Sequence, residues 1–190
     1  MTFREYKGGE LVTNFWSNSK APFHNLSNFA LVPSGIDYDG INYPSIEHAF
    51  QAQKYIQSQR RRFSTSGDLG DWSGIKLVFK PEDYEKKLKF WSKKGNIGIV
   101  AKMATNMKVG KKLGLIRDEK FQPSDDLWLK LLGKKYSIKY FCDILKSTNG
   151  TYLLEFDRGA RIKPVFWGGL ISDNTLYGNN QMGKYLMKLI

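Results

Sequence analysis

The spacing of apolar and polar positions along the chain predicts a mainly helical protein with few strands. Apolar residues recur at three- and four-residue spacing, which is typical of one helix face, in segments 45–57, 81–94, 96–107, 124–134, 138–146 and 181–190. Strand signals are short: an apolar run at 152–156, and a hairpin at Asp39-Gly40 between Ile36 and Ile41. Segments 59–75 and 108–123 and the FWGG and YGNN stretches are predicted loops or linkers. The fold class expected is mainly α, that is, α+β with minor short strands.

Segment 45–57 is the clearest helix, with Ser45 as its expected N-cap. Its polar side chains fall opposite its apolar ones and repeat at about one-turn spacing: Glu47, Gln51, Lys54 and Ser58. Periodicity alone favours a solvent-exposed stripe here over a functional cluster. Glu47 nevertheless lies in the first turn, where the helix dipole favours a carboxylate and keeps it ionised.

Length and composition indicate one soluble domain covering 1–190. The chain has 190 residues, its only cysteine is Cys142, and no run approaches the ~20 apolar residues of a membrane span. We therefore expect no disulfide and no membrane partner, and a cytoplasmic location. Two histidines and one cysteine make a structural zinc site unlikely to form, and no P-loop motif is found, so neither a metal nor a cofactor is expected.

Positive charge is concentrated in the middle of the chain. Of a net charge of +12, residues 76–146 carry 18 basic and 8 acidic side chains, a net of +10. This excess indicates either attraction to phosphate, on nucleic acid or on a nucleotide-like ligand, or simply solvated lysine-rich helix faces. Lysine greatly outnumbers arginine, which disfavours reading of DNA bases.

A second polar cluster lies in the last quarter of the chain. Glu155 and Asp157 precede Trp167, which is followed by two glycines and then by a Tyr-Gly-Asn-Asn run. Glycine beside an aromatic ring allows a ligand or a backbone segment to approach closely. A buried tryptophan in a tight turn explains the same residues equally well.

Taken together, these segments resemble the NADAR family, also called YbiA-like proteins. The matching stretches, in the family's order, are LSNF at 26–29, DGINYPSIEHAFQAQK at 39–54, AKMATN at 101–106, LLE at 153–155, FWGG at 166–169 and GNNQMGKYLM at 178–187. EHAFQAQK is the specific motif among them. The resemblance implies a compact, single-domain, mostly helical N-glycosidase, with an insertion around 58–100. Its substrate would be either a phosphorylated ribosylamino-pyrimidine intermediate of riboflavin synthesis or ADP-ribose attached to guanine in nucleic acid. ADP-ribosylated nucleic acid is therefore a possible partner.

The resemblance also implies roles for individual residues. Glu47 corresponds to the family's active-site glutamate and Lys54 to its helix lysine. The family's two site tryptophans correspond to Trp167 and to Trp128, with Trp72 as the competing assignment. Further substrate-binding residues implied are Asn28, His48, Lys102 and Asn180.

One position departs from the family pattern. Pro164 stands where the family commonly has an aspartate, three residues before the final tryptophan. Either Glu155, taken here as the third catalytic residue, or Asp157 then supplies the second carboxylate, or the activity is altered. The alternative function is a non-catalytic module that binds ADP-ribose or nucleic acid.

The chemistry suits the residue types. Cleaving an N-glycosidic bond develops positive charge at the anomeric carbon, which the carboxylate of Glu47 can stabilise, or Glu47 can activate water. An equally weighted hypothesis is that Lys54 attacks the opened ribosyl carbon and forms a Schiff base.

Overall fold

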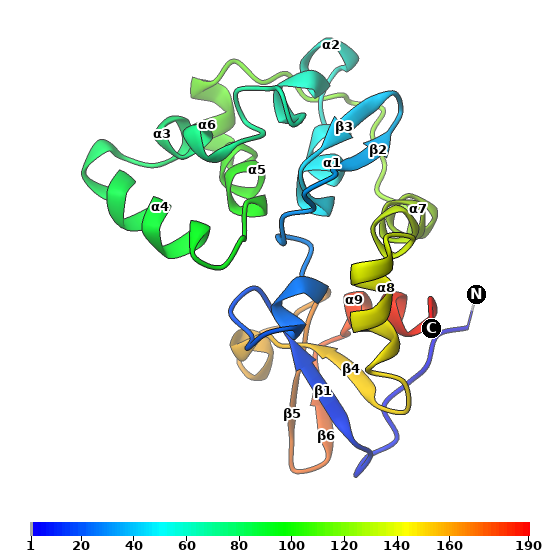
Figure 1. Ribbon diagram of the computed structural model, residues 1–190. Coiled ribbons are helices and arrows are strands. Elements are labelled where there is room, and N and C mark those ends of the chain that lie inside the picture. The colour runs from blue at the N-terminus through cyan, green and yellow to red at the C-terminus, as the bar shows by residue number, and fades with distance from the viewer. Residues whose placement is uncertain (1) are drawn as a thin grey trace. The chain divides into compact units, whose positions relative to one another are not determined.

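The computed structural model describes residues 2–190 and has the predicted α+β composition, with many helices and only two-stranded sheets (Figure 1). The contacts divide the chain into two compact units. Unit 1 consists of the residues up to Ser27 together with Tyr136–Ile190, and unit 2 is Asn28–Lys135. A single domain over 1–190 with an insertion around 58–100 stays a prediction. None of the helices in the described part of the chain is both long and apolar enough to cross a bilayer.

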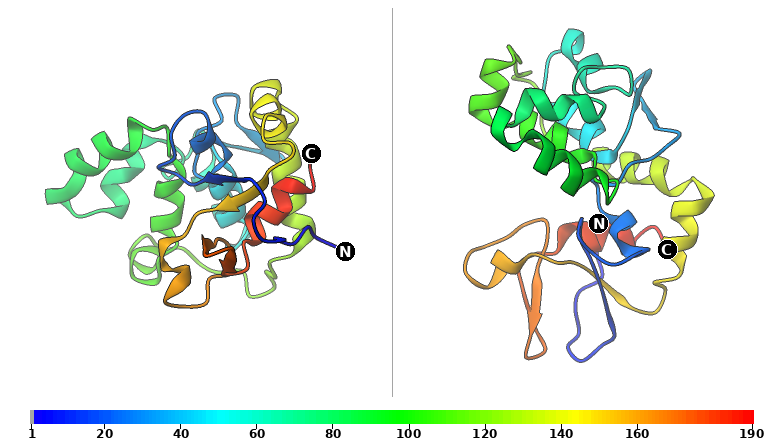
Figure 2. Two further views of the ribbon diagram at one scale, coloured as in Figure 1. Left: turned by 90° about the horizontal axis from the view of Figure 1, so that it is seen from below. Right: turned by 60° about the vertical axis from the view of Figure 1, so that its left-hand side comes forward.

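Unit 1 combines both outer parts of the chain. Its elements are β1 (Val12–Phe15), the 3-10 helix η1 (Phe23–Leu26), α8 (Lys139–Lys146), β4 (Tyr152–Glu155), η5 (Arg158–Arg161), β5 (Leu170–Ser172), β6 (Thr175–Tyr177) and α9 (Gln181–Met187). Strand β1 pairs in parallel with β4, so Val12 lies opposite Tyr152 and Phe15 opposite Glu155 (Figures 1 and 2). The apolar residues 152–154 are buried, which makes β4 the centre of this unit's core.

Helix α9 is fastened to β4 through its first turn. Asn180, immediately before the helix, is fully buried in a left-handed conformation. Its side-chain amide donates to the Leu153 carbonyl at 2.7 Å, and its Oδ1 accepts from the Glu155 amide at 2.9 Å. These bonds satisfy two main-chain groups of β4 that no further strand covers.

Unit 2 holds most of the helices. Its elements are β2 (Ile36–Tyr38), β3 (Ile41–Tyr43), α1 (Ile46–Ala52), α2 (Gln57–Arg60), η2 (Arg61–Phe63), η3 (Trp72–Gly74), α3 (Ile75–Val78), η4 (Pro81–Asp83), α4 (Tyr84–Ser92), α5 (Gly98–Ala104), α6 (Met107–Lys112) and α7 (Asp125–Tyr136), whose last residue falls in unit 1. The Asp39-Gly40 hairpin is confirmed, and both turn residues have the positive φ that its turn type requires.

Helix α1 lies at the centre of unit 2, and all seven of its residues are buried. The start of α5 packs closely against it: a Cβ added to Gly98 would lie 2.5 Å from the Phe29 Cα and 3.0 Å from the Glu47 Cβ. The glycine therefore lets the two helices approach. The solvent-exposed stripe favoured by periodicity is wrong, because a helix enclosed on every side has no solvent face on which polar residues could gather.

Other local expectations were also incomplete. Segment 108–123 is not a simple linker, since α6 extends into it as far as Lys112. The predicted loop around FWGG and YGNN contains the β5–β6 hairpin, whose turn residues Asp173 and Asn174 both have positive φ. Asn and Asp tolerate that conformation better than other side chains, so the Asp-Asn pair was the sequence signal for this turn.

Candidate active site

Glu47 is held in the first turn of α1 by a well-defined helix start. Ser45 is extended, and its hydroxyl accepts a hydrogen bond from the His48 amide at 3.2 Å, which confirms the expected N-cap. The Glu47 amide donates to the Asn28 carbonyl at 3.0 Å. The predicted substrate residue Asn28 thus touches the start of the helix through its main chain, and it is itself buried.

The carboxylate of Glu47 is buried next to an amide and an ammonium group. The residue is 5% exposed, and its Oε1 accepts from Gln51 Nε2 at 2.7 Å and lies 3.9 Å from Lys102 Nζ. Burial raises the pKa of Glu47, while Lys102, the Gln51 hydrogen bond and Lys54 act in the opposite direction. Such a carboxyl can exchange a proton more readily near neutral pH than an exposed one.

Lys102 connects this buried carboxylate with the surface. It belongs to α5, and its side chain is 56% exposed, against 7% for that of Glu47. An anionic group approaching from solvent would meet this ammonium before it reached the carboxylate. Glu47 and Lys102, both named above as site residues, therefore lie next to each other, and their roles stay predictions.

Lys54 follows the end of α1 and is half-buried over an aromatic ring. Its Nζ lies 4.8 Å from the centroid of Phe50. Burial lowers the pKa of the Lys54 ammonium, Glu47 raises it, and Lys102 and Arg117 lower it further. A weakened ammonium has a larger fraction of free amine, which is the form required of a nucleophile.

Trp128 is an interior residue that extends this aromatic packing. It is 3% exposed, and its ring stacks on that of Phe50 with centroids 4.0 Å apart and an interplanar angle of 25°. Phe50 therefore contacts Trp128 on α7 as well as Lys54. The competing Trp72 belongs to η3, and no ring contact between it and α1 is found in residues 2–190. The geometry favours Trp128 as the tryptophan associated with Glu47 and Lys54, although as a wall of the site rather than an open stacking platform.

His48 has a structural environment. It is completely buried, its Nδ1 lies 2.8 Å from the Ser45 hydroxyl, and its Nε2 lies 2.9 Å from the Leu69 carbonyl. Burial lowers the pKa of His48 to about 3, so the ring is neutral. Because both ring nitrogens are engaged with the protein, these contacts argue against the predicted binding of substrate by His48.

Glu155, Trp167 and Asn180 belong to unit 1. Glu155 ends β4, and its amide is held by Asn180. Since both functional groups of the Asn180 amide bind main-chain atoms of β4, the geometry gives it a positioning role toward Glu155. Asp157 accepts from the Gly159 amide at 2.8 Å and caps η5, so its carboxylate has a structural role in this turn.

The glycines after Trp167 serve close backbone packing. A Cβ on Gly168 would lie 2.6 Å from the Glu155 carbonyl oxygen, and one on Gly169 would lie 2.7 Å from that of Tyr177. The Gly169 amide also donates to the Glu155 carbonyl at 2.8 Å. Trp167 itself is 37% exposed, and its ring meets that of Phe166 edge-on. The sequence alone allowed either a ligand or a backbone segment to approach these glycines. In the structure, it is backbone that packs against them.

Gln51 is the site residue that the sequence reasoning did not select. Its amide bonds to Glu47 one helical turn earlier, and the residue is only 2% exposed. The signal was present, because residues four apart share a helix face and a glutamine can donate to a carboxylate there. It was read as part of a solvent-exposed stripe.

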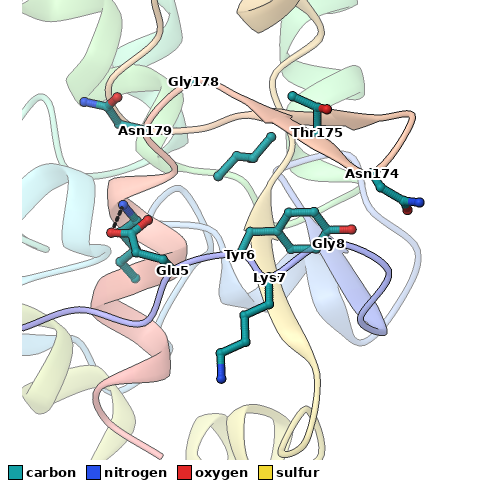
Figure 3. Close-up of a pocket in the computed structure, with 10 residues that line it drawn as sticks. Glu5, Tyr6, Lys7, Gly8, Asn174, Thr175, Gly178 and Asn179 are labelled. Atoms are coloured by element: carbon teal, nitrogen blue, oxygen red, sulfur yellow. Dashed lines mark hydrogen bonds and ion pairs between the residues drawn. The ribbon is translucent and has the colours of Figure 1, made fainter.

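Unit 1 also contains an open polar cavity of about 540 Å³, whose lining includes none of the predicted site residues (Figure 3). Its walls come from the N-terminal segment, the β5–β6 hairpin and α9: Glu5, Tyr6, Lys7, Gly8, Asn174, Thr175, Leu176, Gly178, Asn179 and Lys184. Lys184 Nζ and Glu5 Oε1 are paired at 2.7 Å, and Lys7 is the other charged residue in the lining. No three His, Cys, Asp or Glu side chains of residues 2–190 gather as metal ligands.

A comparison with solved structures finds a protein of similar fold. The chain is similar to the NMR structure of the E. coli protein YbiA, with a TM-score of 0.50 and 21% identity over 95% of this chain and 83% of that one. The two share a fold. No family model matches the chain, and no curated protein matches its sequence. The YbiA-like fold expected from the motifs is therefore found, while the motif residues themselves are the basis for any statement about activity.

Proposed function

We propose that the chain is a NADAR-type N-glycosidase that hydrolyses the bond between ribose and nitrogen in a ribosylated or ADP-ribosylated substrate. The observation that carries this proposal is the buried carboxylate of Glu47, fixed by Gln51 and flanked by Lys102 and Lys54. A solvent-exposed helix stripe would have none of these contacts. The similarity to YbiA in fold is consistent with the proposal.

In the proposed reaction, the C1′–N bond breaks and its electrons remain on the departing nitrogen. The positive charge that develops on the ribose is stabilised by the Glu47 carboxylate. Water adds to C1′, its proton passes to Glu47, and the leaving nitrogen takes up a proton. From the motif resemblance, we propose Glu155 as the acid that supplies that proton.

The burial and the raised pKa of Glu47 suit a group that must both accept and release a proton. Lys102 is more exposed and would contact a phosphate or a hydroxyl of the substrate. The substrates that we propose are ADP-ribosyl-guanine in nucleic acid and phosphorylated ribosylamino-pyrimidines. NAD serves as a third compound for comparison.

The covalent route assigns the nucleophile to Lys54 instead. Its amine would add to C1′ of the ring-opened iminium form, the substrate's nitrogen would take up a proton and leave from C1′, and water would later hydrolyse the resulting imine between Lys54 and C1′. The half-buried position and lowered pKa of Lys54 favour a reactive amine. Borohydride reduction during turnover would trap this imine on the wild type, and the Lys54→Arg variant would show no adduct.

A hydrolysis assay by mass spectrometry tests the proposed function. We expect Glu47→Gln to lose more than about a hundredfold in rate, because the stabilising charge is removed while the side-chain shape remains. Glu119→Gln, an exposed glutamate of the same unit, is the matched control and should retain the wild-type rate. A near-normal rate for Glu47→Gln would refute the assignment of Glu47. If the wild type bound the three compounds tightly but turned over none of them, the result would instead favour the non-catalytic module that Pro164 suggests.

A further inference from the structure

Helix α4 is set at the edge of unit 2 and has no buried residue. In Figure 1 and in the left view of Figure 2, α3 and α5 lie between α4 and the β2–β3 hairpin. It is attached by one face only: Tyr84, Leu88 and Trp91 are half-buried, and the Tyr84 hydroxyl donates to the Lys76 carbonyl at 2.7 Å. A helix fixed along one face presents the opposite face to solvent.

That outward face is basic. Lys86, Lys89 and Lys93 are exposed and follow one another at spacings of three and four residues, which places them in one row along the helix. At 1.5 Å per residue the row extends over about 10 Å. None of the three has a carboxylate within ion-pair distance among residues 2–190. The ammonium groups are therefore available to an external anion.

The surrounding segment adds to this charge rather than neutralising it. Residues 76–94 contain 7 basic and 3 acidic side chains, a net of +4. One of the acids, Glu82, already faces Lys80 at 3.9 Å. A single phosphate would be held by one or two lysines, whereas an extended row matches an extended polyanion.

An aromatic ring lies beside the lysine row. Phe90 is 48% exposed, although it belongs to a helix whose other large apolar side chains turn inward. Its ring meets that of Trp91 edge-on, with centroids 4.9 Å apart, so one exposed ring is supported by a half-buried one. An aromatic face among lysines is the combination on which the bases of a single strand stack while its phosphates are neutralised.

We infer that the outward face of α4 binds single-stranded nucleic acid, with Lys86, Lys89 and Lys93 along the phosphates and Phe90 stacked on a base. A membrane surface fits less well, because a helix that lies in a bilayer interface needs a broad free apolar face. Here Tyr84, Leu88 and Trp91 are committed to the protein. Lysine-based contacts also predict binding without base readout.

This inference does not depend on the proposed glycosidase activity. The Glu47→Gln variant should bind an oligonucleotide as well as the wild type does, and a variant of α4 should hydrolyse a free small substrate at the wild-type rate. Each hypothesis can therefore fail without the other.

The test is fluorescence anisotropy with a labelled single-stranded oligonucleotide of mixed sequence, titrated at several KCl concentrations. We expect the Lys86→Gln/Lys89→Gln/Lys93→Gln variant to bind about tenfold more weakly or worse, and its slope of log affinity against log salt to be smaller by about 2, as expected for three lost contacts to single-strand phosphates. The matched control is Lys108→Gln/Lys111→Gln/Lys112→Gln on α6, which removes the same charge from exposed positions of the same unit. It should keep the wild-type slope.

Phe90→Leu provides the second measurement, because it retains an apolar side chain and removes the ring. We expect about a fivefold or greater loss of oligonucleotide affinity with an unchanged salt slope. Equal losses in the α4 and α6 triple variants would mean diffuse charge attraction and would overturn the inference. So would unchanged oligonucleotide binding by the α4 variant, whether or not that variant lost binding to vesicles containing phosphatidylserine.

Discussion

Replacing Glu47 by glutamine should make the folded protein more stable at neutral pH, although it removes the proposed catalytic group. Gln has the same shape and can still bond to Gln51, but it carries no charge that must be desolvated. The wild-type carboxylate is 5% exposed, and its nearest cation, Lys102 at 3.9 Å, is itself more than half exposed. Compensation by that pair is therefore incomplete, in agreement with the raised pKa of Glu47.

The pH dependence gives this prediction its magnitude. Between the pKa of an unfolded glutamate, about 4.3, and the raised pKa of folded Glu47, the folded state holds a proton that unfolding releases. The free energy of unfolding of the wild type therefore falls as the pH rises through this window, by up to about 1.4 kcal/mol per pH unit. The variant lacks this term, so the difference between the two proteins should grow with pH and then level off.

The assay is urea unfolding at pH values from 4 to 8, with the free energy of unfolding of the variant compared with that of the wild type at each pH. Glu119→Gln, at an exposed position, is the control for the removal of a carboxylate. A difference that is flat with pH, or a wild type that becomes relatively more stable as the pH rises, would refute the reasoning.

Two further predictions concern one feature in each unit of the fold. His48 is buried and its pKa is lowered to about 3, so below about pH 6.5 the unfolded state binds a proton that the folded state excludes. The free energy of unfolding should therefore fall with decreasing pH, by up to about 1.4 kcal/mol per pH unit. Urea unfolding of His48→Asn should lack this dependence. Gly168→Ala should lower the free energy of unfolding by about 1–3 kcal/mol through collision with the Glu155 carbonyl, as measured by thermal melting. Gly133→Ala, inside α7 where a Cβ meets nothing within 4 Å, should raise it by about 0.5–1 kcal/mol, and a loss at Gly133 equal to that at Gly168 would contradict the steric argument.

The parts of the fold that could be predicted were those determined by local chemistry. Ser45 caps the first turn of α1 with its hydroxyl. Asp39 and Gly40 are residue types that tolerate the positive φ of their turn. Six helical segments were located for the same reason, since apolar spacing along a segment is independent of what packs on it. The pairing of β1 with β4 was not predicted, because it joins residues 140 positions apart and leaves no local pattern.

For the candidate site, the residue identities were recognisable but their environment was not. Glu47 and Lys54 stand out through the EHAFQAQK motif. Their burial could not be deduced from that motif, because it results from α5, which packs against α1 through Gly98, some fifty residues later. Gln51 was overlooked for the same reason: its importance depends on a buried carboxylate rather than on its own sequence context.

The parallel pairing of β1 with β4 has a consequence for the order in which the chain acquires its structure during synthesis. Unit 2 is continuous, so Asn28–Lys135 can make its contacts as soon as those residues have left the ribosome. Val12–Phe15 emerge earlier but find their partners in Tyr152–Glu155, and α9 packs on β4 later still. Strand β1 thus remains without its partner until β4 emerges, and during that interval it offers unsatisfied main-chain groups to any other extended segment.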